Sequence, residues 1–202
     1  QIVVTKYPSK SVIIASYVVT GAPYNADMTG KTDATAAFQK ALDDAGKNGG
    51  GTVYAPAGTY RFDGSLTIPQ AVTLRGDWKQ PTDKDQSVGG TVFAVYGGSG
   101  TATGPTFIQL SGGAGVQGIS FWYPNQSITA PIKYPGTIGL SATAVTLRES
   151  SMQDLTFVNS WTGIDTLNPT TKSDQDIYIY NIYGLALDTG LILDDTSSVC
   201  SA

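Results

Sequence analysis

The clearest periodic pattern of apolar residues lies near the start of the chain, in the stretch TDATAAFQKALDDAGKNGGG. Apolar residues recur there at helical spacing and form a single stripe, which predicts an amphipathic helix over about residues 33–45. Thr32 or Asp33 can cap its N-terminus, and Gly46 can take the left-handed position at its end. The stripe consists mostly of small residues around Phe38. We therefore expect the helix to lie flat across the end of a sheet, with Phe38 buried.

After the helix, the pattern changes to short strand-like runs without a helical period. Between residues 50 and 77 these runs are Val53–Ala55, Thr59–Phe62 and Ser65–Leu74, and only Pro, Ala, Gly and Asp separate them. Two folds lay strands down in this way. One is an antiparallel meander, and the other is a coil whose strands turn corners without reversing direction.

A loose repeat favours the coil. The segments GISF at 118–121, DLTF at 154–157 and NIYG at 181–184 each begin a short alternation of apolar and polar residues, at spacings of 36 and 27 residues. The last two repeats align further, because TGI at 162–164 matches TGL at 189–191. Units of this size, with variable insertions at the corners, are typical of a solenoid in which each coil stacks on the previous one.

The run from Tyr24 to Trp78 resembles a known family. Its segments TDATAAFQKAL, GGGTVYAPAGTY and LTIPQAVTLRGDW are similar to the opening of the pectate-lyase-like, glycoside hydrolase family 28-related group of right-handed parallel β-helix proteins. The resemblance implies an all-β fold, a right-handed single-stranded parallel β-helix with a short N-terminal capping α-helix. Residues 1–48 would form the N-terminal arm and the cap, and residues 49–202 the coils. It also implies a secreted or cell-surface protein that acts on polysaccharide.

Composition excludes several classes of chemistry. The 202 residues include no His and one Cys, Cys200, which excludes imidazole catalysis, an internal disulfide and a thiolate metal cluster. The net charge is -4 and basic residues are scattered, so nothing indicates binding to nucleic acid. No apolar run approaches the ~20 residues of a membrane span. We predict no cofactor and no metal, and acid-base chemistry falls to carboxylates.

Glu149 and Asp176 are the candidate catalytic pair. The 27-residue spacing of the last two repeats separates them, and no other pair of acidic residues shares it. Matching positions on neighbouring coils lie about 4.8 Å apart, which is close to the separation of the two carboxylates in retaining glycosidases. Both residues precede their predicted strands, where polar residues ordinarily face water. Solvated turn carboxylates are therefore the alternative interpretation.

Aromatic rings on outward strand positions are the candidate substrate-binding residues. Trp122 and Tyr123 are neighbours, so on a strand they face opposite ways and at least one should point outward. Tyr178 and Tyr180 alternate with isoleucines, so the two tyrosines share the strand face opposite the isoleucines. Trp161 adds another ring. Such rings can bind the apolar faces of sugars. Alternatively, they fill corners or stack within the coils.

The sequence thus predicts a polysaccharide-active β-helix protein, with glycoside hydrolysis by paired carboxylates as the preferred reaction. One alternative is a non-catalytic surface, fibre or tailspike module, and another is a polyuronate lyase, against which the net charge argues. Residues 181–202 show no capping helix, charged edge or proline. We therefore expect further coils, a cleaved partner chain or a second copy to cover this end, and a catalytic site can then lie beyond residue 202.

Overall fold

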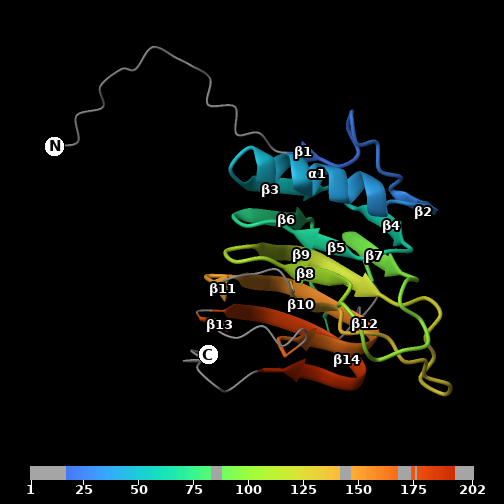
Figure 1. Ribbon diagram of the computed structural model, residues 1–202. Coiled ribbons are helices and arrows are strands. Elements are labelled where there is room, and N and C mark those ends of the chain that lie inside the picture. Colours follow the sequence, from blue (N-terminus) through green and yellow to red (C-terminus); the bar gives the residue numbers. More distant parts are fainter. Residues whose placement is uncertain (1–16, 83–87, 142–146, 168–173, 176, 194–202) are drawn as a thin grey trace, which may run out of the picture.

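The chain folds into a stack of parallel β-strand coils with one helix at its end (Figure 1). The computed structural model describes residues 17–82, 88–141, 147–167, 174–175 and 177–193. All pairings between the named strands are parallel, so the chain turns corners without reversing its direction. The predicted parallel β-helix is confirmed, and the antiparallel meander is excluded.

The strands form three columns, which we call the first, second and third sides. The first side consists of β1 (Tyr17–Val18), β3 (Gly51–Ala55), β6 (Val72–Gly76), β9 (Gly115–Trp122), β12 (Ser151–Asp165) and β14 (Tyr178–Ile192). The second side consists of β2 (Thr29–Asp33), β4 (Gly58–Phe62), β7 (Thr91–Val95) and the continuations of β9, β12 and β14. The third side consists of β5 (Leu66–Ile68), β8 (Ile108–Leu110), β10 (Ile138–Leu140) and the last parts of β12 and β14. A separate short pair joins β11 (Leu147–Arg148) to β13 (Asp174–Gln175).

The strand register reproduces the sequence repeat. Leu155 pairs with Ile119 on the preceding coil and with Ile182 on the next, which are the spacings of 36 and 27 residues seen in the sequence. One predicted strand is wrong, because the run Ser65–Leu74 contains two strands, β5 and β6. The chain turns a corner between them at residues 69–71, where proline cannot donate a ladder hydrogen bond.

The helix α1 spans Thr35–Lys47, so it begins and ends slightly later than predicted. Asp33 precedes it, and the Asp33 carboxylate accepts hydrogen bonds from the backbone N–H and the hydroxyl of the first helical residue. The prediction for Gly46 is wrong, because Gly46 is helical and a Cβ there would lie 2.7 Å from Cβ of Pro69. The left-handed backbone follows the helix, at Gly49 with a φ of 88°.

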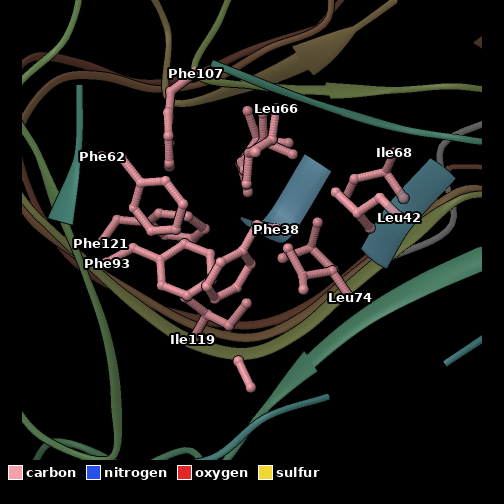
Figure 2. Close-up of a cluster of buried hydrophobic side chains, with 14 of the residues drawn as sticks. Phe38, Leu42, Phe62, Leu66, Ile68, Leu74, Phe93, Phe107, Ile119 and Phe121 are labelled. Atoms are coloured by element: carbon pink, nitrogen blue, oxygen red, sulfur yellow. The ribbon is translucent and has the colours of Figure 1, made fainter. Parts of the chain in front are cut away.

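Phe38 lies in the apolar cluster that joins the helix to the coils (Figure 2). Its side chain is fully buried, and its ring centroid lies 5.1, 5.0 and 5.2 Å from those of Tyr60, Phe62 and Phe93. Each of these contacts is edge-to-face, an arrangement that stabilises aromatic pairs beyond the area they bury. Phe121 on the next coil lies 5.8 Å from Phe93 and extends the row of rings. The predicted burial of Phe38 is confirmed.

Candidate functional site

A column of long polar and aromatic side chains runs along the outside of the first side. Strand residues alternate between inward and outward directions, so one outward position recurs on every coil. The register aligns five such residues on β3, β6, β9, β12 and β14, namely Tyr54, Arg75, Gln117, Gln153 and Tyr180. We call them the outer column. None of them is buried, so the outer column presents a continuous strip of hydrogen-bonding groups and rings.

The neighbouring outward position carries threonine, serine or glycine on four of these five strands. Its residues, in the same strand order, are Thr52, Thr73, Gly115, Ser151 and Tyr178. At the last coil, Tyr178 is 56% exposed and Tyr180 is 68% exposed, whereas Ile179 between them packs against the core. The predicted alternation is therefore correct, and two tyrosine rings stand out from the surface.

Tyr54, at the helix end of the outer column, is fixed by a carboxylate. Its hydroxyl donates a 2.7 Å hydrogen bond to Oδ2 of Asp77, which also accepts the backbone N–H of Ala57 at 3.1 Å. The hydrogen bond to Asp77 raises the pKa of Tyr54 above its ordinary value, because the bond favours the protonated phenol. The bond to Asp77 therefore holds the Tyr54 hydroxyl in one defined orientation.

A carboxylate that the sequence analysis missed lies at the corner between the first and second sides. Asp154 Oδ1 accepts a 2.7 Å hydrogen bond from Nδ2 of Asn181, and Asp154 Oδ2 accepts a 3.3 Å bond from Nε2 of Gln117. Three successive coils therefore meet at this one carboxylate. The signal was present in the sequence, because Gly118, Asp154 and Asn181 are the first letters of the three repeats. A search for pairs of acidic residues does not find Asp154, because the matching positions on the other two coils are a glycine and an asparagine.

A cavity lies on the second side, beside the outer column. Trp78 contacts this region from the segment that follows β6, and its Nε1 donates a 3.0 Å hydrogen bond to Oγ1 of Thr156. The ring of Tyr183 lies 5.6 Å from that of Trp78, and its hydroxyl accepts a 2.9 Å bond from Nε2 of Gln80. The cavity has a volume of about 480 Å³ and is lined by Pro81, Thr82, Thr156, Phe157, Val158, Asn159, Tyr183, Gly184 and Leu185. Rings beside amides and hydroxyls suit a carbohydrate ligand.

The proposed catalytic pair is only half within the described residues. Glu149 is exposed, lies between β11 and β12 and has a φ of 60°. Asp176 lies outside the described residues. The register on both sides of Glu149 keeps the 27-residue offset, with Arg148 paired to Gln175 and Ser151 paired to Tyr178. The distance between the Glu149 and Asp176 carboxylates stays a prediction.

The structure changes the interpretation of the earlier aromatic residues. Tyr123 is only 1% exposed, and its hydroxyl is hydrogen-bonded to Oγ1 of Thr137 at 2.8 Å. Burial raises the pKa of Tyr123. This ring therefore fills a corner of the interior, and Tyr123 is no outward sugar platform. Its neighbour Trp122 is half-buried on the second side, and Trp161 packs partly against the core.

Two negative findings bear on the site. Among the described residues, no three acidic or cysteine side chains lie close enough together to hold a metal ion. In the same part of the chain, no helix has the length and apolar character needed to cross a membrane.

Comparison with known proteins relates the N-terminal part of the chain to a known family. The family described as rhamnogalacturonase A/epimerase, pectate lyase-like, matches residues 22–111. Mannuronan C5-epimerase AlgE5 of Azotobacter vinelandii is 40% identical over 96 residues, and alginate lyase 7 of the same organism is 56% identical over 60 residues. The chain is a parallel β-helix protein, and its residues 22–111 are similar to the pectate-lyase-like family. The two matches cover 41% and 26% of it but only 10% and 7% of the relatives, so the chain spans a tenth or less of their length.

Solved structures share the parallel β-helix fold of this chain. The catalytic unit of the GH87 α-1,3-glucanase from Streptomyces thermodiastaticus strain HF3-3 has a TM-score of 0.55 at 22% identity, over 83% of this chain and 26% of that one. An iota-carrageenase has a TM-score of 0.53 at 14% identity, over 84% and 36% of the two chains. At such identities the likeness establishes the fold and not the reaction.

Proposed function

We propose that the outer column binds an extended polysaccharide and that the protein acts on this bound chain. The observation that carries the proposal is the unbroken register of five outward, unburied side chains on successive coils. Exposed Tyr178 and Tyr180 offer ring faces for the apolar faces of sugars, and Gln117 and Gln153 offer donors and acceptors for hydroxyls. Because neighbouring strands repeat at about 4.8 Å, a chain laid along the stack meets one outward side chain of the outer column on each coil.

A second observation favours a uronate-containing polysaccharide. Arg75 is exposed within the outer column and takes part in neither of the two ion pairs found among the described residues. A guanidinium binds a carboxylate through two parallel hydrogen bonds, which a neutral sugar cannot supply. Relatives named mannuronan epimerases and an alginate lyase act, by those names, on such polymers. The net charge of -4 opposes a polyanion at long range, so the local contact with Arg75 has to supply the attraction.

For the reaction, we retain hydrolysis by Glu149 with Asp176 as the first candidate and lyase cleavage of a uronate chain as the second. Hydrolysis needs one protonated and one ionised carboxyl group across the scissile bond. Lyase cleavage needs a base to remove the proton beside the uronate carboxylate. A non-catalytic module that only binds the chain is the third outcome. Each of these three functions requires contact with polysaccharide, so we expect the protein at the cell surface or outside the cell.

The test exposes the protein to alginate, polygalacturonate and a neutral glucan, and follows both binding and products. Replacing Arg75 by Gln is expected to weaken alginate binding about tenfold or more, since a hydrogen-bonded charge pair contributes about 1.5–3 kcal/mol, and to leave binding of the neutral glucan unchanged. Lys31→Gln, an equal charge change on the second side, is the control and should leave alginate binding near that of the parent. Equal losses in both variants, or no binding of any polymer, would contradict the role of the outer column.

Product analysis separates the reactions. Hydrolysis releases new reducing ends without ultraviolet absorbance, whereas lyase cleavage creates an absorbing unsaturated sugar at each cut. Glu149→Gln is expected to abolish hydrolysis and to retain binding, because only the proton-transfer group changes. Full hydrolytic activity in that variant would remove Glu149 from the mechanism, and binding without any product would support the non-catalytic module.

We also propose that β14 binds another layer of β-structure, which comes from further coils, a cleaved partner chain or a second copy. Among the described strands β14 pairs only with β12, and Leu185, Leu191 and Leu193 on this coil are 53%, 45% and 41% exposed. An open strand edge beside apolar side chains is a template for association. The chain alone is expected to scatter light as an oligomer, and Leu191→Lys should shift it towards 21.1 kDa. A parent monomer whose β14 amides resist hydrogen exchange would refute this coverage.

A further inference from the structure

The carboxylate of Asp154 contacts a side chain of the outer column. β9, β12 and β14, which carry Gln117, Asp154 and Asn181, are stacked one on the next (Figure 1). Asp154 Oδ2 accepts the 3.3 Å hydrogen bond from Nε2 of Gln117, and Asp154 Oδ1 accepts the 2.7 Å bond from Nδ2 of Asn181. All three side chains are half-buried, so none is sealed from a ligand. A change at Asp154 therefore acts directly on Gln117, which belongs to the outer column.

The contact with Asp154 fixes the direction in which the Gln117 amide faces. A carboxylate only accepts hydrogen bonds, so the NH2 group of Gln117 has to face Asp154, and the carbonyl oxygen of Gln117 cannot. In a planar amide the oxygen and the nitrogen lie on opposite sides of the carbon that joins them. Oε1 of Gln117 is therefore directed away from the corner and is left as an acceptor on the outer column.

The backbone at this corner recurs on three coils. Gly118, Asp154 and Asn181 occupy matching positions, with φ values of 75°, 56° and 59°. Aspartate and asparagine adopt such left-handed backbone more readily than most residues that carry a side chain. Asparagine in place of Asp154 is therefore compatible with the fold, as Asn181 shows on the next coil. The exchange alters the chemistry, because an amide donates hydrogen bonds as well as accepting them.

We propose that Asp154 is a positioning residue that sets the specificity of the outer column at the coil of β9. It directs the carbonyl oxygen of Gln117 towards the bound polymer, where that oxygen accepts a hydrogen bond from a sugar hydroxyl and repels a sugar carboxylate. On the preceding coil Arg75, which is paired in register with Gln117, offers two parallel donors to a carboxylate. The outer column then selects a polysaccharide that presents a carboxylate to one coil and a hydroxyl to the next. This inference rests on the function proposed for the outer column.

The charge of Asp154 acts in the same direction as the Gln117 carbonyl. Neither of the two ion pairs between described residues includes Asp154. A sugar carboxylate placed at Gln117 would therefore meet a like charge directly behind the amide. Arg75 and Asp154 thus give adjacent coils opposite preferences for a carboxylate.

The test measures the binding of alginate and of a neutral glucan by calorimetry, with Asp154→Asn made in two backgrounds, the parent and Gln117→Ala. With asparagine at 154, the Gln117 amide is free to turn its NH2 group towards the polymer. The ratio of alginate affinity to glucan affinity is therefore expected to rise in the parent background. In the Gln117→Ala background only the effect of the lost charge remains. The rise in the parent background is expected to be about threefold to tenfold larger, the share of one hydrogen bond, and this difference is the coupling between Asp154 and Gln117.

Asp188→Asn is the control for charge, because Asp188 is exposed on β14 and lies outside the outer column. It should leave the ratio near that of the parent. An equal rise in both backgrounds would mean that Asp154 acts through charge alone, and an unchanged ratio would mean that it only supports the stacking of coils. Either result would overturn the inference.

Arg75→Gln distinguishes failure of this inference from failure of the proposed function. If Arg75→Gln weakens alginate binding while the two backgrounds respond equally to Asp154→Asn, the outer column binds the polymer and only the role of Asp154 is wrong. If no polymer binds, or if Arg75→Gln binds alginate as tightly as the parent, the proposed function is wrong and this inference fails with it.

Discussion

Replacing Phe38 by alanine is expected to lower the free energy of unfolding by about 3–5 kcal/mol, the usual cost of truncating a buried phenylalanine. The ring is fully buried and makes three edge-to-face contacts, with Tyr60, Phe62 and Phe93. Those partners come from the first two coils, so the truncation opens a cavity at the junction between the helix and the stack. Chemical denaturation followed by circular dichroism measures the change.

Lys47→Ala is the control for this prediction. Lys47 is exposed in the last turn of the same helix, so its loss is expected to change stability by no more than about 0.5 kcal/mol. Phe38→Leu should fall between the two, because it keeps most of the apolar volume and loses the ring contacts. A Phe38→Ala protein that unfolds at the same denaturant concentration as the parent would show that the helix does not cap the coils.

Replacing Gly118 by alanine is expected to cost about 2–5 kcal/mol, because two penalties add together. Gly118 has a φ of 75°, a conformation that L-residues rarely adopt. A Cβ at this position would also lie 2.5 Å from the carbonyl oxygen of Gly76 on the preceding coil, and that backbone oxygen cannot move without shifting the coil. The same thermal or chemical unfolding experiment detects the loss.

Gly49→Ala separates the two penalties. Gly49 has a similar φ of 88°, but a Cβ there would meet nothing within 4 Å. Gly49→Ala is therefore expected to lower the free energy of unfolding only by the cost of the left-handed backbone, about 1–2 kcal/mol. If both alanine variants lose the same stability, then the close approach of Gly118 to Gly76 contributes nothing and the coils are packed less tightly at this corner than the structure indicates.

Much of the fold follows from the sequence because its signals are local. The helical stripe around Phe38 identified the cap, and the repeat spacings of 36 and 27 residues are the spacings at which Leu155 pairs with Ile119 and Ile182. The alternation in DIYIYNIYG also indicated the outward direction of Tyr178 and Tyr180. In each case a period along the chain sets which side of a helix or strand faces the core, so neighbouring residues are sufficient to predict it.

Only the tertiary structure determined which residues contact one another at the corners of the coils. Trp78 bonds to Thr156, which lies 78 positions away, because the segment after β6 crosses the second side. Asp154 meets Gln117 and Asn181 only when three coils stack, and Tyr123 is covered by the corner that contains Tyr134. Corner insertions have no period, and their contacts are with other coils and not with their sequence neighbours. The sequence therefore determined the coil, its cap and the outward faces of its strands. The stacking of coils decided which corner residues meet, and it also decided where cavities form.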